Sequence, residues 1–168
     1  MLTMAGNKLS NALTWLYGSF AEVTWAQVGI LLFMSVFLSL VPMFWAKEFN
    51  LVLLGEDQAR EMGLNVRKFN RLMLILASVL TSVCVAFCGI IGFVGLVIPH
   101  LCRMLLGSDH RMVLPASFCF GAVMLMLADL LARTGYYGME LPVGAITTVI
   151  GIPVFAYLLI KRGRIYDG

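Results

Sequence analysis

The chain has 168 residues, of which 61% are hydrophobic and 12% are charged, and its mean hydropathy is +0.93. A soluble domain carries about a quarter of its residues as charges, so this composition excludes a water-soluble globule and indicates a membrane protein. The net charge of +3 comes from small basic groups spread along the sequence, which argues against a nucleic-acid-binding surface.

The first apolar run is predicted to cross the membrane once. Residues 1–22 precede it, and we expect them to be a truncated start on the outer side. Residues 23–46 carry no charge and form the predicted span 1, because a spanning helix needs about 20 mostly apolar residues. Trp25 and Trp45 near its ends are typical of membrane interfaces, and Pro42 predicts a kink or an early end.

Residues 48–68 are predicted to form a charged loop with two short helices at the membrane surface. Gly63 is expected to end the first helix and Asn65 to cap the second. The loop is either a solvated connection that sets topology or a docking surface for a soluble partner. Its length, against about 2–8 residues for ordinary helix connections, and its mixture of acidic and basic residues favour docking. The first helix is indicated by four apolar residues that recur at roughly helical spacing: Leu51, Leu54, Ala59 and Met62.

The rest of the chain supplies the other spans. Residues 72–102 carry no formal charge and are too long for one helix. Glycines and a proline in this run predict that it folds back, because both residues disfavour helix. The chain is therefore expected to be an all-α membrane protein with about five transmembrane helices and two short cytoplasmic helices. The remaining predicted spans are span 2 (72–90), a short or broken span 3 (92–106), span 4 (112–133) and span 5 (141–160).

The basic residues predict the orientation. Cytoplasmic loops of membrane proteins carry an excess of Lys and Arg. With five spans, one set of loops and ends holds ten of the twelve basic residues, and the other holds only Lys8 and Arg133. The N-terminus is therefore expected outside, and the C-terminus and the loop at 48–68 inside.

Several motifs together resemble a known family. The sequence resembles the FecCD-type permease subunits of ATP-binding-cassette importers, which take up iron–siderophore complexes, haem and cobalamin. Members are about twice this length, so the resemblance implies a partial permease domain over residues 1–168, the carboxyl-terminal half with helices six to ten. The matching segments are WLYGSF (15–20), LLGEDQAREMGLNV (53–66), GFVGLVIPHLCRMLLGSDHRMVLP (92–115), ADLLAR (128–133) and ELPVGAITTVIGIPVF (140–155).

The resemblance also implies roles for individual residues. Arg133 matches a position that pairs with an acidic residue of the substrate-binding protein on the outer side. In such importers the charged loop sits in a cleft of the ATP-hydrolysing subunit. The implied ATPase-coupling residues are Leu54, Gly55, Glu56, Ala59, Arg60 and Gly63.

Alternatives remain open for the other marked residues. Arg133 has a local partner in Asp129, four residues earlier, and pairing is compatible with docking. Several small or helix-breaking residues either pack helices together or line the pathway: Gly92, Gly95, Pro99, Gly144, Thr147 and Gly151. His100, His110 and the cysteines lack the convergence that a metal site needs, so no metal site is expected.

These observations predict a transport subunit of the inner membrane rather than an enzyme. No phosphate-binding loop or catalytic set is present in the sequence, so ATP is expected to be used by a partner subunit and no cofactor to be bound by this chain. The expected partners are an ATPase subunit, a substrate-binding protein, a second permease copy or homologue, and the lipid bilayer. The rival interpretations are half of a split permease, a non-functional remnant that acts as an assembly partner, and, with less support, a secondary transporter. The sequence does not indicate which chelate is carried.

Overall fold

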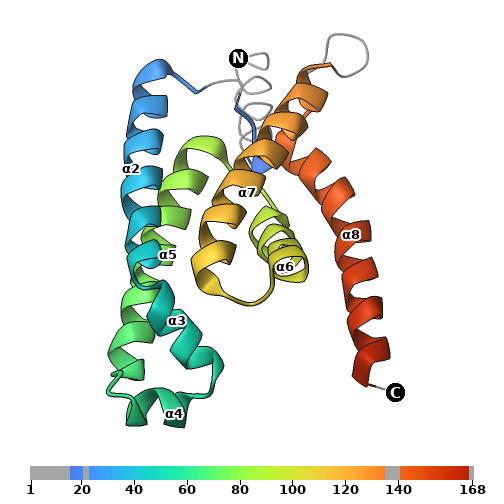
Figure 1. Cartoon of the computed structure of the whole chain (residues 1–168). Coiled ribbons are helices and arrows are strands. Elements are labelled where there is room, and N and C mark those ends of the chain that lie inside the picture. The colour runs from blue at the N-terminus through green and yellow to red at the C-terminus, as the bar shows by residue number, and fades with distance from the viewer. Residues whose placement is uncertain (1–15, 21–22, 135–140, 167–168) are drawn as a thin grey trace. The chain divides into compact units, whose positions relative to one another are not determined.

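The computed structural model describes residues 16–20, 23–134 and 141–166, and the secondary structure within these ranges is helical. This confirms the predicted all-α fold class. Most of the expected outer start at 1–22, and Glu140 before span 5, fall outside the described residues. Figure 1 shows the helices in chain order: α2 (Trp25–Phe44), α3 (Ala46–Leu53), α4 (Glu56–Glu61), α5 (Val66–Cys88), α6 (Val94–Leu106), α7 (His110–Arg133) and α8 (Val143–Tyr166).

The long helices fall on the predicted apolar runs. In the described part of the chain, α2, α5 and α7 are each long and apolar enough to cross a membrane. Two shorter apolar helices accompany them, α6 and the Val143–Leu158 part of α8. With 13 residues, α6 is shorter than the roughly 20 that a straight span requires. The folding back expected at residues 72–102 therefore takes the form of a long helix followed by a short one.

Local sequence signals explain most helix ends. The backbone N–H of Thr24 donates to Gln27 Oε1 at 2.8 Å at the start of α2. The backbone N–H of Lys68 donates to Asn65 Oδ1 at 3.1 Å, which confirms the predicted cap on α5. Gly63 has φ +88° after α4, as a terminating glycine does. Pro42 lies in the last turn of α2, which ends two residues later.

The prediction of one helix from Leu51 to Met62 was wrong. α3 ends at Leu53, and α4 begins only at Glu56. Gly55 between them has φ +120°, a conformation that L-residues with side chains rarely adopt. The apolar residues at 51, 54, 59 and 62 therefore belong to two helices and their ends, and their helical spacing across Gly55 is incidental.

The turn between α5 and α6 has an unusual backbone. Gly89 follows α5 with φ +72°, and Phe93 precedes α6 with φ +65°. A positive φ at a bulky residue is uncommon and costs free energy, so the surroundings must hold Phe93 in place. Its side chain lies against α8 at Gly151.

The described chain packs as two compact units, and α6 and α7 contribute to both. The first unit comprises Val23–Phe87 and Leu101–Cys119. In this unit α2 lies beside α5, and α3 and α4 lie together where α2 ends and α5 begins (Figure 1). Among the described residues, the second unit comprises 16–20, 88–100, 120–134 and 141–166. Its buried cluster joins α7 to α8 and consists of Ala128, Ala132 and Val143, with Phe20 and Ile146 packed against it.

Candidate functional site

The charged segment of the first unit is an ordered element, which we call the α3–α4 element (residues 46–61). α4 carries Glu56 and Asp57 in its first turn and Arg60 in its last, an order that complements the helix dipole. Arg60 forms ion pairs with Glu56 at 3.0 Å and with Asp57 at 3.4 Å. All three side chains are about half exposed or more, so each pair stabilises α4 by only about 0.3–0.5 kcal/mol. The charges are therefore available to an outside partner.

The residues predicted to couple to an ATPase occupy different environments in this element. Glu56 and Arg60 are exposed, and Leu54 is 57% exposed. Ala59 is fully buried, so its methyl group seats α4 against its own chain rather than meeting a partner. The predicted residues Gly55 and Gly63 flank α4 on either side with positive φ, and no neighbour within 4 Å would meet a Cβ at either. α4 is thus a short rigid piece between two glycine turns.

Two apolar residues of this surface were not singled out as contact residues from the sequence. Leu53 is 58% exposed and Met62 is 61% exposed, on either side of the charged helix. Together with Leu54 they place apolar side chains around the charges of α4. Exposed apolar groups beside charged ones are typical of a protein-binding surface. The helical pattern had suggested that Met62 belongs to a buried face, and the break at Gly55 removes that reason.

Aromatic contacts fix α3 to the start of α5. The rings of Phe49 and Phe69 meet edge to face with centroids 4.9 Å apart, and Trp45 lies 6.1 Å from the same Phe69 ring. Phe69 is almost completely buried. Edge-to-face aromatic pairs contribute about 0.5–1.5 kcal/mol beyond the area that they bury. A displacement of α3 must therefore also disturb the first turns of α5.

A polar cluster ties the same helix to the start of α7, and we call it the Asn50 latch (Asn50, Asp109 and His110). Asn50 Nδ2 donates to Asp109 Oδ1 at 2.6 Å. The backbone N–H of His110 donates to Asn50 Oδ1 at 2.8 Å, and His110 Nδ1 lies 2.9 Å from the same oxygen. The His110 ring also stacks on Phe49 with centroids 5.3 Å apart. One side chain of α3 thus binds three groups of the α6–α7 turn.

Asp109 also caps α7. Its Oδ1 accepts a hydrogen bond from the backbone N–H of Arg111 at 2.9 Å. That bond, followed by the one from the Asn50 amide, lowers the pKa of Asp109 below its ordinary value of 3.8. Because a lowered pKa favours the charged form, Asp109 stays ionised throughout the physiological pH range and keeps a charged acceptor for the Asn50 amide.

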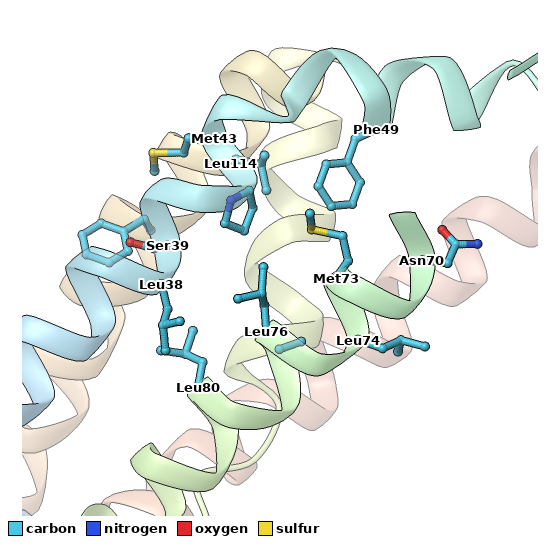
Figure 2. Close-up of a pocket in the computed structure, with 13 residues that line it drawn as sticks. Leu38, Ser39, Met43, Phe49, Asn70, Met73, Leu74, Leu76, Leu80 and Leu114 are labelled. Carbon is cyan, nitrogen blue, oxygen red and sulfur yellow. The ribbon is translucent and has the colours of Figure 1, made fainter. Parts of the chain in front are cut away.

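An apolar cavity lies behind the α3–α4 element within the first unit. It has a volume of about 700 Å³ and is lined by residues of α2, α3, α5 and α7. Figure 2 shows Leu38 of α2 and Leu80 of α5 meeting at one end, with Phe49 and Met73 at the other. Asn70 and Leu74 lie at its edge on α5 (Figure 2). The apolar lining contains few polar atoms and is suited to hydrocarbon rather than to a charged chelate.

Arg133, the predicted docking residue for a substrate-binding protein, lies at the end of α7 in the second unit. Its Nε donates to Asp129 Oδ2 at 2.8 Å, which confirms the local pair. The Arg133 side chain is still 57% exposed, so the pair orients the guanidinium without covering it. The pairing and a docking role are therefore compatible.

The small residues of α8 pack closely against other parts of the second unit. A Cβ on Gly144 would clash with Tyr17 O and would lie 2.6 Å from Ile90 O. A Cβ on Gly151 would lie 2.8 Å from Phe93 Cγ. Thr147 is fully buried, and its hydroxyl donates to Gly144 O at 3.0 Å. Gly144 therefore lets α8 approach backbone atoms, Gly151 makes room for the Phe93 side chain, and Thr147 fills a buried position between them.

The corresponding residues around α6 are less crowded. A Cβ on Gly92 would meet Thr148 Oγ1 at an ordinary 3.5 Å, and nothing lies within 4 Å of one on Gly95. Pro99 is half-buried inside α6. Packing within the described residues therefore requires glycine at neither position 92 nor position 95. In the part of the chain that the structure describes, no group of three or more His, Cys, Asp and Glu side chains could hold a metal ion.

The chain is similar to transport permeases over nearly its whole length. Residues 1–161 match the FecCD transport family. The chain is 43% identical over 166 residues to the uncharacterized ABC transporter permease YvrB of Bacillus subtilis, covering 98% of this chain and 46% of that protein. It is 41% identical over 162 residues to the cobalamin import permease BtuC of Halobacterium salinarum, covering 96% and 43%. The hemin transport permease HmuU of Yersinia pestis is 37% identical over 148 residues, covering 88% and 44%.

A solved structure shares the fold. It is a chain assigned to a metal-chelate type ABC transporter in an inward-facing conformation, with a TM-score of 0.85 and 34% sequence identity. The match covers 92% of this chain and 50% of that one. The chain thus spans about half the length of the relatives that it matches. Family match, sequence identity and fold agree, and the chain belongs to the FecCD transport family.

Proposed function

We propose that this chain forms part of the translocation pathway of an ATP-driven importer, and that its α3–α4 element receives the ATPase subunit. The observation that carries the proposal is the exposed charged helix α4, flanked by the exposed apolar residues Leu53, Leu54 and Met62. The cargo is an iron chelate or a related metal complex, such as a siderophore, haem or cobalamin. Relatives named for cobalamin, hemin and iron dicitrate transport support this range.

The contacts behind α4 explain how such an element passes on movement. An ATPase that pushes on α4 also moves α3, because Leu54 and Gly55 are the only residues between them. α3 is held to α5 through Phe49 and Phe69, and to α7 through Asn50 and Asp109. A shift of the α3–α4 element is therefore passed to the ends of two long helices together. Packed contacts of this kind transmit a displacement better than a flexible loop does.

The partners follow from the same proposal. ATP is bound and hydrolysed by the partner subunit, and this chain binds no cofactor. A substrate-binding protein docks on the outer side near Arg133, whose exposed guanidinium is suited to a carboxylate on that partner. A second permease copy or homologue completes the pathway in the cytoplasmic membrane.

The docking surface is tested by exchanging two charges. The double substitution E56R/R60E reverses the charges that a partner meets but leaves residues 56 and 60 able to pair with each other. It is expected to abolish capture of the ATPase subunit and substrate uptake by the full transporter. A matched control is K68Q, a charge change on nearby α5, which should leave both unchanged. Normal ATPase capture by E56R/R60E, with normal uptake, would remove these residues from the interface.

A further inference from the structure

A second cavity of the first unit, which we call the α4–α5 groove, runs along α5 from its charged end into its apolar part. Its volume is about 660 Å³. Four of its lining residues recur every four positions on α5 and therefore form one row along the helix: Arg67, Arg71, Ile75 and Val79. The row is basic at the first two positions and apolar at the next two. The groove thus changes from charged to apolar along the direction of α5.

The charged end of the groove has three arginines and one carboxylate among its lining residues. That carboxylate, Glu56, is paired with Arg60, and Arg60 also pairs with Asp57. Among the described residues, no carboxylate lies within ion-pair distance of Arg67 or Arg71. These two arginines lie one turn apart on α5, and their like charges repel each other. They also occupy the first turns of α5, where the helix dipole is positive and disfavours cations. A bound anion would offset both effects.

The apolar end of the groove lacks a cover. Leu74 is 67% exposed, Ile75 is 54% exposed and Val79 is 44% exposed. Val79 lies eight positions after Arg71, about 12 Å further along the helix, which carries the groove from the predicted membrane interface into the hydrocarbon layer. A soluble protein docked at α4 does not reach that depth. A molecule that fills the whole groove must have an anionic end and a hydrocarbon end.

We propose that the α4–α5 groove binds an anionic phospholipid from the leaflet that faces the α3–α4 element. Its phosphate lies between Arg67 and Arg71, and one acyl chain lies along Leu74, Ile75 and Val79. Basic pockets at the membrane interface bind anionic headgroups in this manner, and the apolar row supplies the rest of the fit. Because Glu56 and Arg60 form the other wall, the lipid headgroup also contacts the helix that we propose as the ATPase-docking element.

The site is tested by native mass spectrometry of the full chain in mild detergent with phosphatidylglycerol or phosphatidylcholine added. The wild-type chain should retain phosphatidylglycerol in preference to phosphatidylcholine. R67Q/R71Q should retain at least about tenfold less phosphatidylglycerol, from the loss of two near-surface charges. The matched control K68Q removes a charge from the same turn of α5 outside the groove and should retain it. I75W fills the apolar end without removing charge and should also release the lipid.

Three results would overturn the proposal. One is equal retention of the two lipids by the wild-type chain. Another is unchanged phosphatidylglycerol retention by R67Q/R71Q, provided that its thermal midpoint matches that of K68Q and the two variants are therefore equally folded. The third comes from a photo-crosslinker at position 75 in the assembled transporter: labelling of lipid supports the site, whereas labelling of a protein segment shows that another chain covers the groove. Soluble glycerol phosphate is used as a competitor in the same experiment. If millimolar amounts displace the lipid, the groove binds an anion and does not require an acyl chain.

Discussion

At the scale of single residues, Asn50 has the largest number of long-range polar contacts in the α3–α4 element. Its amide bonds groups 59 and 60 residues away in the sequence. No local pattern predicts such a contact, because asparagine in a charged segment usually signals a cap or a turn. By contrast, Asn65 and Gly63 act within a few residues of their own positions, and the sequence was sufficient to predict both.

Removal of the Asn50 amide should loosen α3 from α7. Asn50→Ala leaves Asp109 and the His110 N–H without this partner, and we expect a loss of about 1 kcal/mol, at the low end for buried groups because Asp109 is exposed. Asn50→Asp should cost more, since it replaces the donor with a second carboxylate facing Asp109. Thermal unfolding of the purified chain measures both changes. Asn70→Ala, on α5, is the control, and equal midpoints for all three variants would show that the latch contributes nothing.

At the scale of elements, the sequence was sufficient to locate the apolar helices. It was not sufficient to predict which segments pack against each helix face. The long apolar runs and their glycine and proline interruptions are local signals that depend on composition. The split between α3 and α4 was missed because the apolar spacing continued across Gly55. Likewise, Gly144 and Gly95 look equivalent as residues, and only the tertiary structure shows that one meets backbone atoms and the other meets none.

This difference between glycines gives a prediction for α8. Gly144→Ala should destabilise the chain by about 1–3 kcal/mol, because the new methyl group meets backbone oxygens that cannot move aside. Gly151→Ala should also destabilise the chain but cost less, since its new methyl group meets a single residue, at Phe93 Cβ, whereas the methyl group at position 144 meets two backbone carbonyl groups. The matched control is Gly121→Ala in α7, where no atom lies within 4 Å and alanine favours helix by about 1 kcal/mol. Detergent-solubilised thermal midpoints should rank the three in that order, and a Gly144→Ala midpoint at or above that of Gly121→Ala would contradict the packing.

At the scale of the whole molecule, membrane orientation decides what the α3–α4 element can meet. Ten of twelve basic residues fall on one predicted side, and the element lies on that side. We expect Glu61→Cys to react with a membrane-impermeant maleimide only after cells are opened, and Thr134→Cys to react in intact spheroplasts. Both variants are made in a Cys119→Ser background, because Cys119 is the exposed cysteine of the described residues. The opposite labelling pattern would place α4 outside and end the ATPase-docking proposal.

Helix α2 has a consequence for biogenesis. None of its residues is buried within the chain, and its spanning window has a mean hydropathy of 2.1. Entry into the bilayer during synthesis therefore depends on the composition of α2 itself and does not wait for later helices to be translated. Substitutions on its surface should accordingly alter insertion efficiency and lateral assembly with neighbouring subunits, while the stability of the mature fold changes little.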